Sequence, residues 1–578
     1  MAPQLPPGVR IQRHSPSHRA LHATRPFSPG DVIATFSDPL LALPDGATMR
    51  TTCNYCLRVP SPLQPPSQQP GDGKQEGDPS KQLRACTACK AAVYCGPGCQ
   101  RAHWKAVHKA ECKMFARVRE QAGKEWLPTS VRAAAQVLMR LKGGDKAMLE
   151  AFGTGGDGED GEGHGLKGNA ERFRAYEEAW RDIELQAAAA AVYSGMLDKE
   201  EVLAQAREIL CKIQTNAFNR SDADAGMGGI FLDPGLAMVN HSCVPNAFIG
   251  FDKRTATLRA ERPIEEGQEI TISYVDYTLP RAARHEALRQ YHFQCACPRC
   301  ADDLDVYDVC KASPILARLG SFSLQPDLDR LRNPSIDRSK APKAEIEALY
   351  KKWRTLSKPS DAESDEDAQL ALARSRWALC RPLVEARMWA VEPLPSTILA
   401  VATSWQTSYK RVVYALPLLC FLATECDPVK HPAPFAPWRV KGLVAIAKVV
   451  AVTAELTASG ALARRCAHEG IVGALATADQ VTLCEALLRL AVQHGAVAAA
   501  EGWEVLREAR SMLEDVESLQ GRERESGLLR AWAKDPEDPE GAAFFEDQVL
   551  KPVRTLASFA VEGLEAMLTG EDLGEELV

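Results

Sequence analysis

The spacing of apolar positions in the first half of the chain predicts short strands joined by turns. In PFSPGDVI (26–33) a Pro-Gly turn precedes β-forming residues, and EGQEITISY (266–274) repeats this order with Glu-Gly before a strand. Gly and Pro interrupt regular structure, and short apolar runs bounded by them are typical of strands. The two stretches therefore predict a small β-rich domain.

A helical region separates these two stretches. LPTSVRAAAQVLMRL (127–141) has apolar residues at helical spacing, with Thr129 or Ser130 as the expected N-cap. Residues 169–192 are rich in Ala, Glu and Arg and also predict helix. Between them, GTGGDGEDGEGHGLKG (153–168) has the composition of a flexible acidic linker.

The last part of the chain, residues 301–578, shows helical periodicity and no motif that carries chemistry. We expect paired antiparallel helices there. Two apolar runs, 412–424 and 442–456, are candidates for membrane spans. The first is short and contains Pro417, and the second is interrupted by Lys448, so both predict buried helices.

Length and charge set broad limits. A chain of 578 residues exceeds one hydrophobic core, so several domains are expected. The formal net charge of −7 is small for this length and gives no global sign of nucleic-acid binding. The N-terminal residues lack an apolar segment, so we expect no secretory signal, an intracellular location and no disulfides.

The cysteines are distributed unevenly. Of 18 cysteines, seven lie between residues 53 and 112, where they form four pairs together with one histidine. Short gaps of two or three residues let both members of a pair bind one metal ion, and eight ligands fill two closed tetrahedral zinc sites. Spacing alone leaves the pairing of the ligands open. The eight are Cys53, Cys56, Cys86, Cys89, Cys95, Cys99, His108 and Cys112.

VYCGPGCQRAHWKAVHKAEC (93–112) resembles the second half of a MYND zinc finger. The resemblance implies interleaved, structural sites: one zinc on Cys53, Cys56, Cys95 and Cys99, the other on Cys86, Cys89, His108 and Cys112. The long gap between Cys56 and Cys86 departs from the family. Its Pro-, Gly-, Gln- and Ser-rich composition predicts a disordered loop.

The finger region is basic. Residues 50–119 hold 12 Lys and Arg against 4 Asp and Glu. Two zinc ions and seven thiolates reduce the resulting charge to about +5. Such a surface could meet an acidic protein or a nucleic acid, although a solvated face explains it equally well. A proline-rich peptide is a further expected partner of the finger.

The flanking motifs together resemble a SET domain, the fold of one class of protein-lysine methyltransferases. ATRPFSPGDVI, TNAFNR, NHSCVPN, EGQEITISY and YHFQCACPRC follow the family order over residues 10 to 300. A SET domain interrupted by a MYND finger is the organisation of the SET-and-MYND family. The implied fold class is α+β and multidomain: a β-rich SET domain split by the finger, then an all-α, tetratricopeptide-like C-terminal domain.

This resemblance divides the chain into six parts. They are the first SET part (1–49), the MYND finger (50–115), a helical insert with its flexible loop (116–204), the second SET part (205–284), a post-SET zinc segment (285–302) and the helical C-terminal domain (303–578).

The resemblance also assigns roles around S-adenosylmethionine. The Asn216 side chain and the backbone of Asn240 and His241 would hold the amino-acid end of the cofactor. Tyr274 would point its hydroxyl at the transferred methyl group and the amine. Tyr291 and Phe293 would wall the lysine channel or stack near the adenine.

Cys243 has two competing interpretations. Cys295, Cys297 and Cys300 are one ligand short of a tetrahedron, and in the SET-and-MYND pattern the cysteine of NHSC completes a third zinc site. The rival is a nucleophile pair of Cys243 with His241. We expect this pair to be poorly placed for a direct proton relay.

One departure concerns the cofactor. SET domains usually open with Gly-x-Gly, where this chain has His18-Arg19-Ala20, although Arg19 could offer its charge to the cofactor carboxylate. The expected function is methylation of lysines in histone or non-histone proteins, in the nucleus and cytoplasm and away from membranes. The alternative is a zinc-binding adaptor with a weak or inactive SET domain.

Overall fold

The computed structural model describes residues 5–15, 18–59, 83–153, 165–196, 200–222, 226–312, 337–340, 343–356, 366–408, 411–498 and 503–569. The chain forms two compact units. Unit 1 contains residues 1–274 and 288–294, and unit 2 contains residues 275–287 and 295–578. The predicted disordered loop and most of the acidic Gly-rich segment lie outside the described residues.

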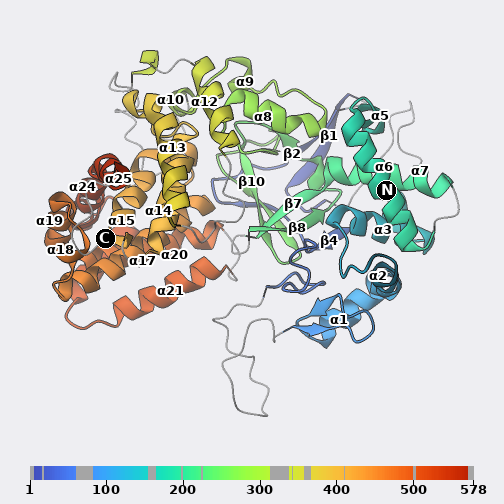
Figure 1. The fold of residues 1–578 in the computed structure, drawn as a ribbon, viewed down its shortest axis with the longest axis horizontal. Coiled ribbons are helices and arrows are strands. Elements are labelled where there is room, and N and C mark those ends of the chain that lie inside the picture. Colours follow the sequence, from blue (N-terminus) through green and yellow to red (C-terminus); the bar gives the residue numbers. More distant parts are fainter. Residues whose placement is uncertain are drawn as a thin grey trace, which may run out of the picture. The chain divides into compact units, whose positions relative to one another are not determined.

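Unit 1 holds several small sheets rather than one large sheet (Figure 1). The antiparallel hairpin consists of β1 (Val9–Ser15) and β2 (His18–Ala23). One three-stranded sheet has the order β10 (Ala247–Asp252), β11 (Thr255–Ala260), β3 (Val32–Phe36). The other has the order β4 (Leu41–Leu43), β8 (Gly226–Leu232), β7 (Phe218–Asp222). These sheets, with the helical unit 2, confirm the predicted α+β class.

The two turns predicted at Pro-Gly and Glu-Gly are present. Gly30 has φ 89° and Gly267 has φ 80°, in the left-handed region that favours glycine. The Gly30 amide donates to the Ala260 carbonyl, and the Gly267 amide donates to the Ala23 carbonyl. Each turn thus connects a segment from the N-terminal part of the unit 1 sequence with a segment from its C-terminal part.

The helical insert differs from prediction in two details. α3 (Thr129–Lys142) begins after Pro128, so neither Thr129 nor Ser130 is its N-cap. The Thr129 hydroxyl instead bonds the Asp45 carboxylate, since the side chain faces the loop after β4. The second predicted helix is divided at Tyr176 into α5 (Ala170–Arg174) and α6 (Glu177–Ser194).

Two hydrophobic cores lie within unit 1. One consists of the β-rich part and includes Phe231 and Leu258. The other joins the finger to the insert, because Phe115 of α2 (Lys109–Ala122) and Val131 of α3 belong to the same buried cluster. The finger therefore shares its core with the insert helices.

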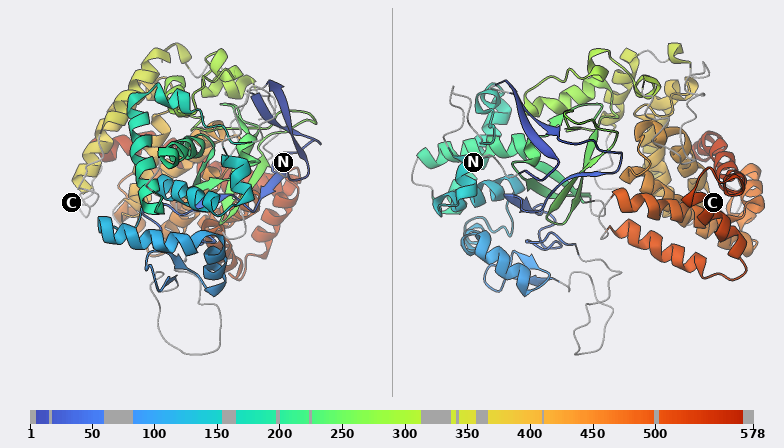
Figure 2. Two further views of the ribbon diagram at one scale, coloured as in Figure 1. Left: turned by 90° about the vertical axis from the view of Figure 1, so that its right-hand side faces the viewer. Right: turned by 180° about the vertical axis from the view of Figure 1, so that it is seen from behind.

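Unit 2 is helical over its described residues, as predicted for the C-terminal region. Its longest helices include α13 (Glu366–Glu385), α17 (Pro437–Ala458) and α20 (Gln480–Ala498). α17, α20 and α21 (Glu504–Glu517) lie side by side (Figure 2). The apolar stretch Val412–Lys430 has the length and composition of a membrane span, but 83% of its apolar window is buried inside this unit. That position fits the predicted buried helix.

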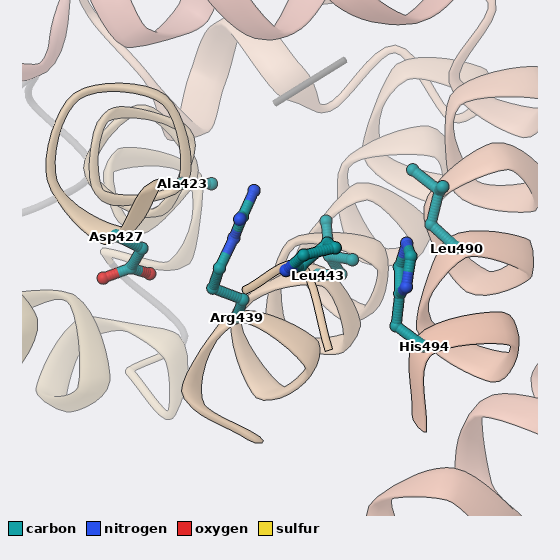
Figure 3. A pocket seen from close by; sticks show the side chains of 7 residues that line it. Ala423, Asp427, Arg439, Leu443, Leu490 and His494 are labelled. Atoms are coloured by element: carbon teal, nitrogen blue, oxygen red, sulfur yellow. The ribbon is translucent and has the colours of Figure 1, made fainter. Parts of the chain in front are cut away.

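A cavity in unit 2 is lined by both apolar and charged side chains. In Figure 3, Arg439 of α17 lies between the side chains of Asp427 and His494, of which only His494 belongs to α20. The space open to the centres of water molecules is about 20 Å³, enough for a single water. Burial, then the charge of Arg439, lowers the pKa of His494 from 6.5 to about 3. Burial raises the pKa of Asp427 to about 6.

These two groups should act on stability with opposite signs. The unfolded chain protonates His494 near pH 6.5 and the folded chain does so only near pH 3, so acidification from pH 7.5 to 5 favours unfolding by about 2 kcal/mol. Folded Asp427 takes up its proton near pH 6 and opposes this loss. We expect His494→Gln to flatten, and Asp427→Asn to steepen, the loss of stability measured by calorimetry over this range. Parallel pH profiles for the two variants would contradict this account.

Candidate functional site

Two strands of two residues each fix the centre of the site in unit 1. β9 (Asn240–His241) pairs in parallel with β12 (Thr271–Ile272). The predicted strand over EITISYV is therefore shorter than expected. Asn246 reinforces the pairing, because its Nδ2 donates to the Glu269 carbonyl at 2.9 Å and its Oδ1 accepts from the Thr271 amide at 2.8 Å. NHSCVPN and EGQEITISY are thus held in one register.

Four rings gather at the end of this pairing. Tyr274 lies 4.8 Å from Tyr291, 5.4 Å from His241 and 6.3 Å from Phe293, between ring centroids. Tyr291 ends the short helix η4 (Arg289–Tyr291). Phe293 also approaches His241 at 5.8 Å, yet 39% of its surface is exposed. The predicted channel and adenine residues therefore share one aromatic cluster, with one face still open to solvent.

The Tyr274 hydroxyl has a fixed direction. It donates to the Val239 carbonyl at 2.6 Å, directly before the NHSCVPN motif. Burial, then the proximity of Tyr291 and Glu269, raises the pKa of Tyr274 above its ordinary value of 10. Burial also raises the pKa of Tyr291. Both hydroxyls therefore keep their protons at neutral pH, and Tyr274 acts as a hydrogen-bond donor.

His241 and Cys243 are in contact, which corrects the expectation that they are poorly placed for each other. Their Nε2 and Sγ atoms lie 3.3 Å apart, because the chain turns directly after β9. The Tyr274 amide, however, donates to His241 Nδ1 at 2.9 Å. With Nδ1 accepting, the neutral ring carries its proton on Nε2 and cannot take one from Cys243. The tautomer thus disfavours the nucleophile pair.

The predicted cofactor residues are held by backbone carbonyls. Asn216 Nδ2 donates to the carbonyls of Lys167 and Lys212, each at 2.7 Å. Asn240 Nδ2 donates to the Arg19 carbonyl at 3.0 Å and to Glu269 Oε1 at 2.9 Å. The Arg19 guanidinium bonds the Gly165 carbonyl at 3.0 Å. These contacts place Arg19 and Asn240 together, and they tie Arg19 and Asn216 to residues 165–167.

The finger brings its eight ligands together in the predicted interleaved sets. Within each set, the ligand atoms all lie within 4.8 Å of one another. Cys56 to Cys95 is 3.6 Å and Cys86 to Cys112 is 3.9 Å between sulfurs. A tetrahedral zinc with Zn–S bonds of about 2.3 Å has S···S edges of about 3.8 Å. Both donor sets fit zinc in closed sites.

A buried carboxylate lies behind the second finger site. Glu111 is fully buried and accepts from His108 Nδ1 at 2.8 Å, from Arg132 Nε at 2.7 Å and from Gln136 Nε2 at 2.7 Å. Burial alone would raise its pKa, but the charge of Arg132 and the bond from His108 hold the pKa well below the usual range. A ligand histidine is thereby oriented by a carboxylate that α3 also binds.

The remaining predicted ligands are divided between the units. Cys295, Cys297 and Cys300 belong to unit 2, and their sulfurs lie within 4.8 Å of one another. The buried Arg284 directs a guanidinium nitrogen at the Cys300 sulfur at 3.6 Å. Cys243 is buried in unit 1. The third zinc site stays a prediction.

Sequence reasoning missed several residues that support the site. Local sequence patterns give no role to Asn246 or Val239, because their contacts join segments far apart in the chain. Glu111 stands three residues after the ligand His108, a spacing that could have suggested a carboxylate partner. Its contacts with Arg132 and Gln136 span more than twenty residues and leave no local pattern in the sequence.

Comparison with known proteins agrees with this architecture. Residues 18–275 match the family model of the SET domain. The SET domain and MYND-type zinc finger protein 6 of Schizosaccharomyces pombe is 30% identical over 277 residues, which cover 47% of this chain and 48% of that protein. The histone-lysine N-methyltransferase SMYD3 of Homo sapiens is 28% identical over 299 residues, which cover 50% and 61%.

The histone-lysine N-methyltransferase ASHR1 of Arabidopsis thaliana is 27% identical over 298 residues, covering 50% of this chain and 54% of that protein. The chain thus spans about half the length of the curated relatives it matches. Fold, site and family model agree on a SET domain over residues 18–275. With paired cysteine sets between its two SET parts, this half of the chain is similar to SET-and-MYND proteins.

The buried position of Glu111 predicts a large effect of its removal. Glu111→Gln leaves the buried Arg132 without a carboxylate, so we expect the free energy of unfolding of unit 1 to fall by about 3 kcal/mol in urea titrations. The control is Glu125→Gln, whose ion pair with Arg50 is half exposed on both sides. That change should cost less than about 1 kcal/mol. Equal losses in the two variants would rule out a special role for the buried carboxylate.

Proposed function

We propose that this protein is an S-adenosylmethionine-dependent protein-lysine N-methyltransferase. The observation that supports it most is the aromatic cluster of Tyr274, Tyr291, Phe293 and His241, with the Tyr274 hydroxyl fixed on the Val239 carbonyl. Two relatives that are named histone-lysine N-methyltransferases are similar to this chain over about half of its length. Histone or non-histone lysines, and action in the nucleus and cytoplasm, belong to the same proposal.

The reaction needs a neutral lysine amine aligned with a methyl group. When bound by the residues named below, S-adenosylmethionine would supply that group as a sulfonium methyl for transfer to the amine nitrogen. The rings of Tyr274 and Tyr291 exclude water, which disfavours the ammonium form and lowers the pKa of the substrate lysine. Because the pKa of Tyr274 is raised, its hydroxyl stays protonated and helps to orient the reacting groups.

The residues proposed to hold the cofactor suit its chemistry. Both donor contacts of the Asn216 amide go to backbone carbonyls, so its Oδ1 is the atom that can accept from an ammonium group. Arg19 offers a positive charge for a carboxylate. The exposed ring of Phe293 offers an apolar surface for the adenine. The backbone of Asn240 and His241 completes the proposed site.

Removing one hydroxyl tests the catalytic assignment. Tyr274→Phe keeps the ring packing but loses the bond to Val239, so we expect turnover of a lysine peptide to fall by about a hundredfold or more, with a small change in cofactor affinity. Mass spectrometry of the peptide and calorimetric titration of the cofactor provide the two measurements. Tyr193→Phe, at the end of α6, is the control. Undiminished turnover in the Tyr274 variant would refute the assignment.

The titration also separates the two candidate functions. The absence of the usual glycines supports the alternative of an inactive adaptor. Ala20 is fully buried in β2, at a position where SET domains usually have a glycine close to the cofactor. An adaptor would bind no S-adenosylmethionine but would capture a proline-rich or acidic partner through the finger. Binding with measurable methyl transfer would exclude it.

Metal content tests the zinc assignments. We propose three structural ions: two in the finger, and one on Cys295, Cys297 and Cys300 with Cys243. Elemental analysis of purified protein should give three zinc ions per chain. Cys89→Ser in the finger and Cys297→Ser in unit 2 should each lower this number by about one. Two ions in the wild type, with no change in the Cys297 variant, would contradict the third site.

A further inference from the structure

We infer that His292 is a positioning residue, which the helical insert uses to hold Tyr291 against Tyr274. The insert contributes Phe173 and Tyr176, whose rings contact His292 from two directions; we call these three rings the His292 clamp. The contacts are independent of any assigned activity. Their consequence for catalysis rests on the proposed function.

The backbone explains why the His292 ring points away from the rings of Tyr291 and Phe293. It has φ 59°, in the left-handed region that few residues other than glycine adopt. Its amide donates to the Arg289 carbonyl and closes η4. The chain reverses here, so Tyr291 and Phe293 both reach Tyr274, while the His292 ring reaches the insert. A strained residue held between two ring contacts is a fixed point for the side chains on either side.

The clamp combines an anchored ring with an accessible one. Phe173 is 3% exposed and meets His292 edge-on, with centroids 4.3 Å apart and planes at 83°. Tyr176 is 44% exposed and stacks on the other side, at 6.0 Å and 30°. Arg172 donates to the His292 carbonyl, and the Arg289 guanidinium lies 5.6 Å from the Tyr176 ring centroid. Phe173 thus fixes the clamp in the core, and Tyr176 closes it from the surface.

The same stretch of the insert contacts the other side of the site. Gly165 and Lys167 accept hydrogen bonds from Arg19 and Asn216, and they stand six to eleven residues before Phe173 and Tyr176 along the chain. Residues 165–176 therefore touch both the proposed cofactor residues and the segment that carries Tyr291. Loosening the clamp should change the position of Tyr291, and with it the width of the proposed lysine channel.

Tyr176 offers the cleanest test, because its exposed ring can be removed without opening the core. In Tyr176→Ala we expect amide hydrogen exchange over residues 289–294 to become about three- to tenfold faster, as the loss of one ring contact predicts. The ratio of multiply to singly methylated lysine peptide should shift at least threefold. Tyr176→Phe keeps the ring and should match the wild type. Leu185→Ala, which removes an exposed apolar side chain of the following helix α6, is the control.

The two readouts separate this inference from the proposed function. Unchanged exchange over 289–294, or an unchanged product ratio in an active Tyr176→Ala enzyme, would overturn the positioning role. A wild type that transfers no methyl group would refute the proposed function instead, and the exchange measurement would still decide whether the clamp holds the segment. A change of the same size in Leu185→Ala would also overturn the inference, since it would show a general loss of packing.

Discussion

The site depends on one asparagine side chain. Asn246 bonds the Glu269 carbonyl before β12 and the Thr271 amide at its start, and so holds NHSCVPN beside EGQEITISY, although the paired strands are only two residues long. Such a short parallel pair has few hydrogen bonds of its own, and the side chain supplies what the strands lack. Tyr274 follows directly from this register: its amide meets His241 and its hydroxyl meets Val239. Tyr274 is therefore placed in the aromatic cluster by polar contacts.

Much of this arrangement could be predicted from sequence. The glycine turns at Gly30 and Gly267, the strand that starts at Val32 and the helix that ends at Lys142 all follow from local composition. The ligand sets of the finger needed a family pattern, since four pairs of ligands can be combined in several ways. The resemblance to the SET motifs predicted that Tyr274 and His241 would both lie around the cofactor. In each case the signal lay within a few residues or in a known order of motifs.

Other features depend on tertiary contacts that local patterns do not contain. Thr129 looked like a helix cap, but its hydroxyl bonds Asp45, more than eighty residues earlier. His241 and Cys243 are expected from sequence to be poorly placed for each other, yet their side chains are in contact after a very short strand. The Tyr274 amide disfavours proton transfer between them, because it fixes the tautomer of the His241 ring. The clamp around His292 likewise joins residues more than one hundred positions apart.

The bonding of Glu111 has a consequence for the modularity of the finger. A boundary drawn at residue 115 by motif would keep the carboxylate and discard Arg132 and Gln136, which neutralise and solvate it in the core. It would also divide the cluster that contains Phe115 and Val131. The finger is therefore a separate motif in the sequence, but its folding depends on contacts with α3. Grafted onto another protein, or exchanged between relatives, it would need the facing surface of α3 to travel with it.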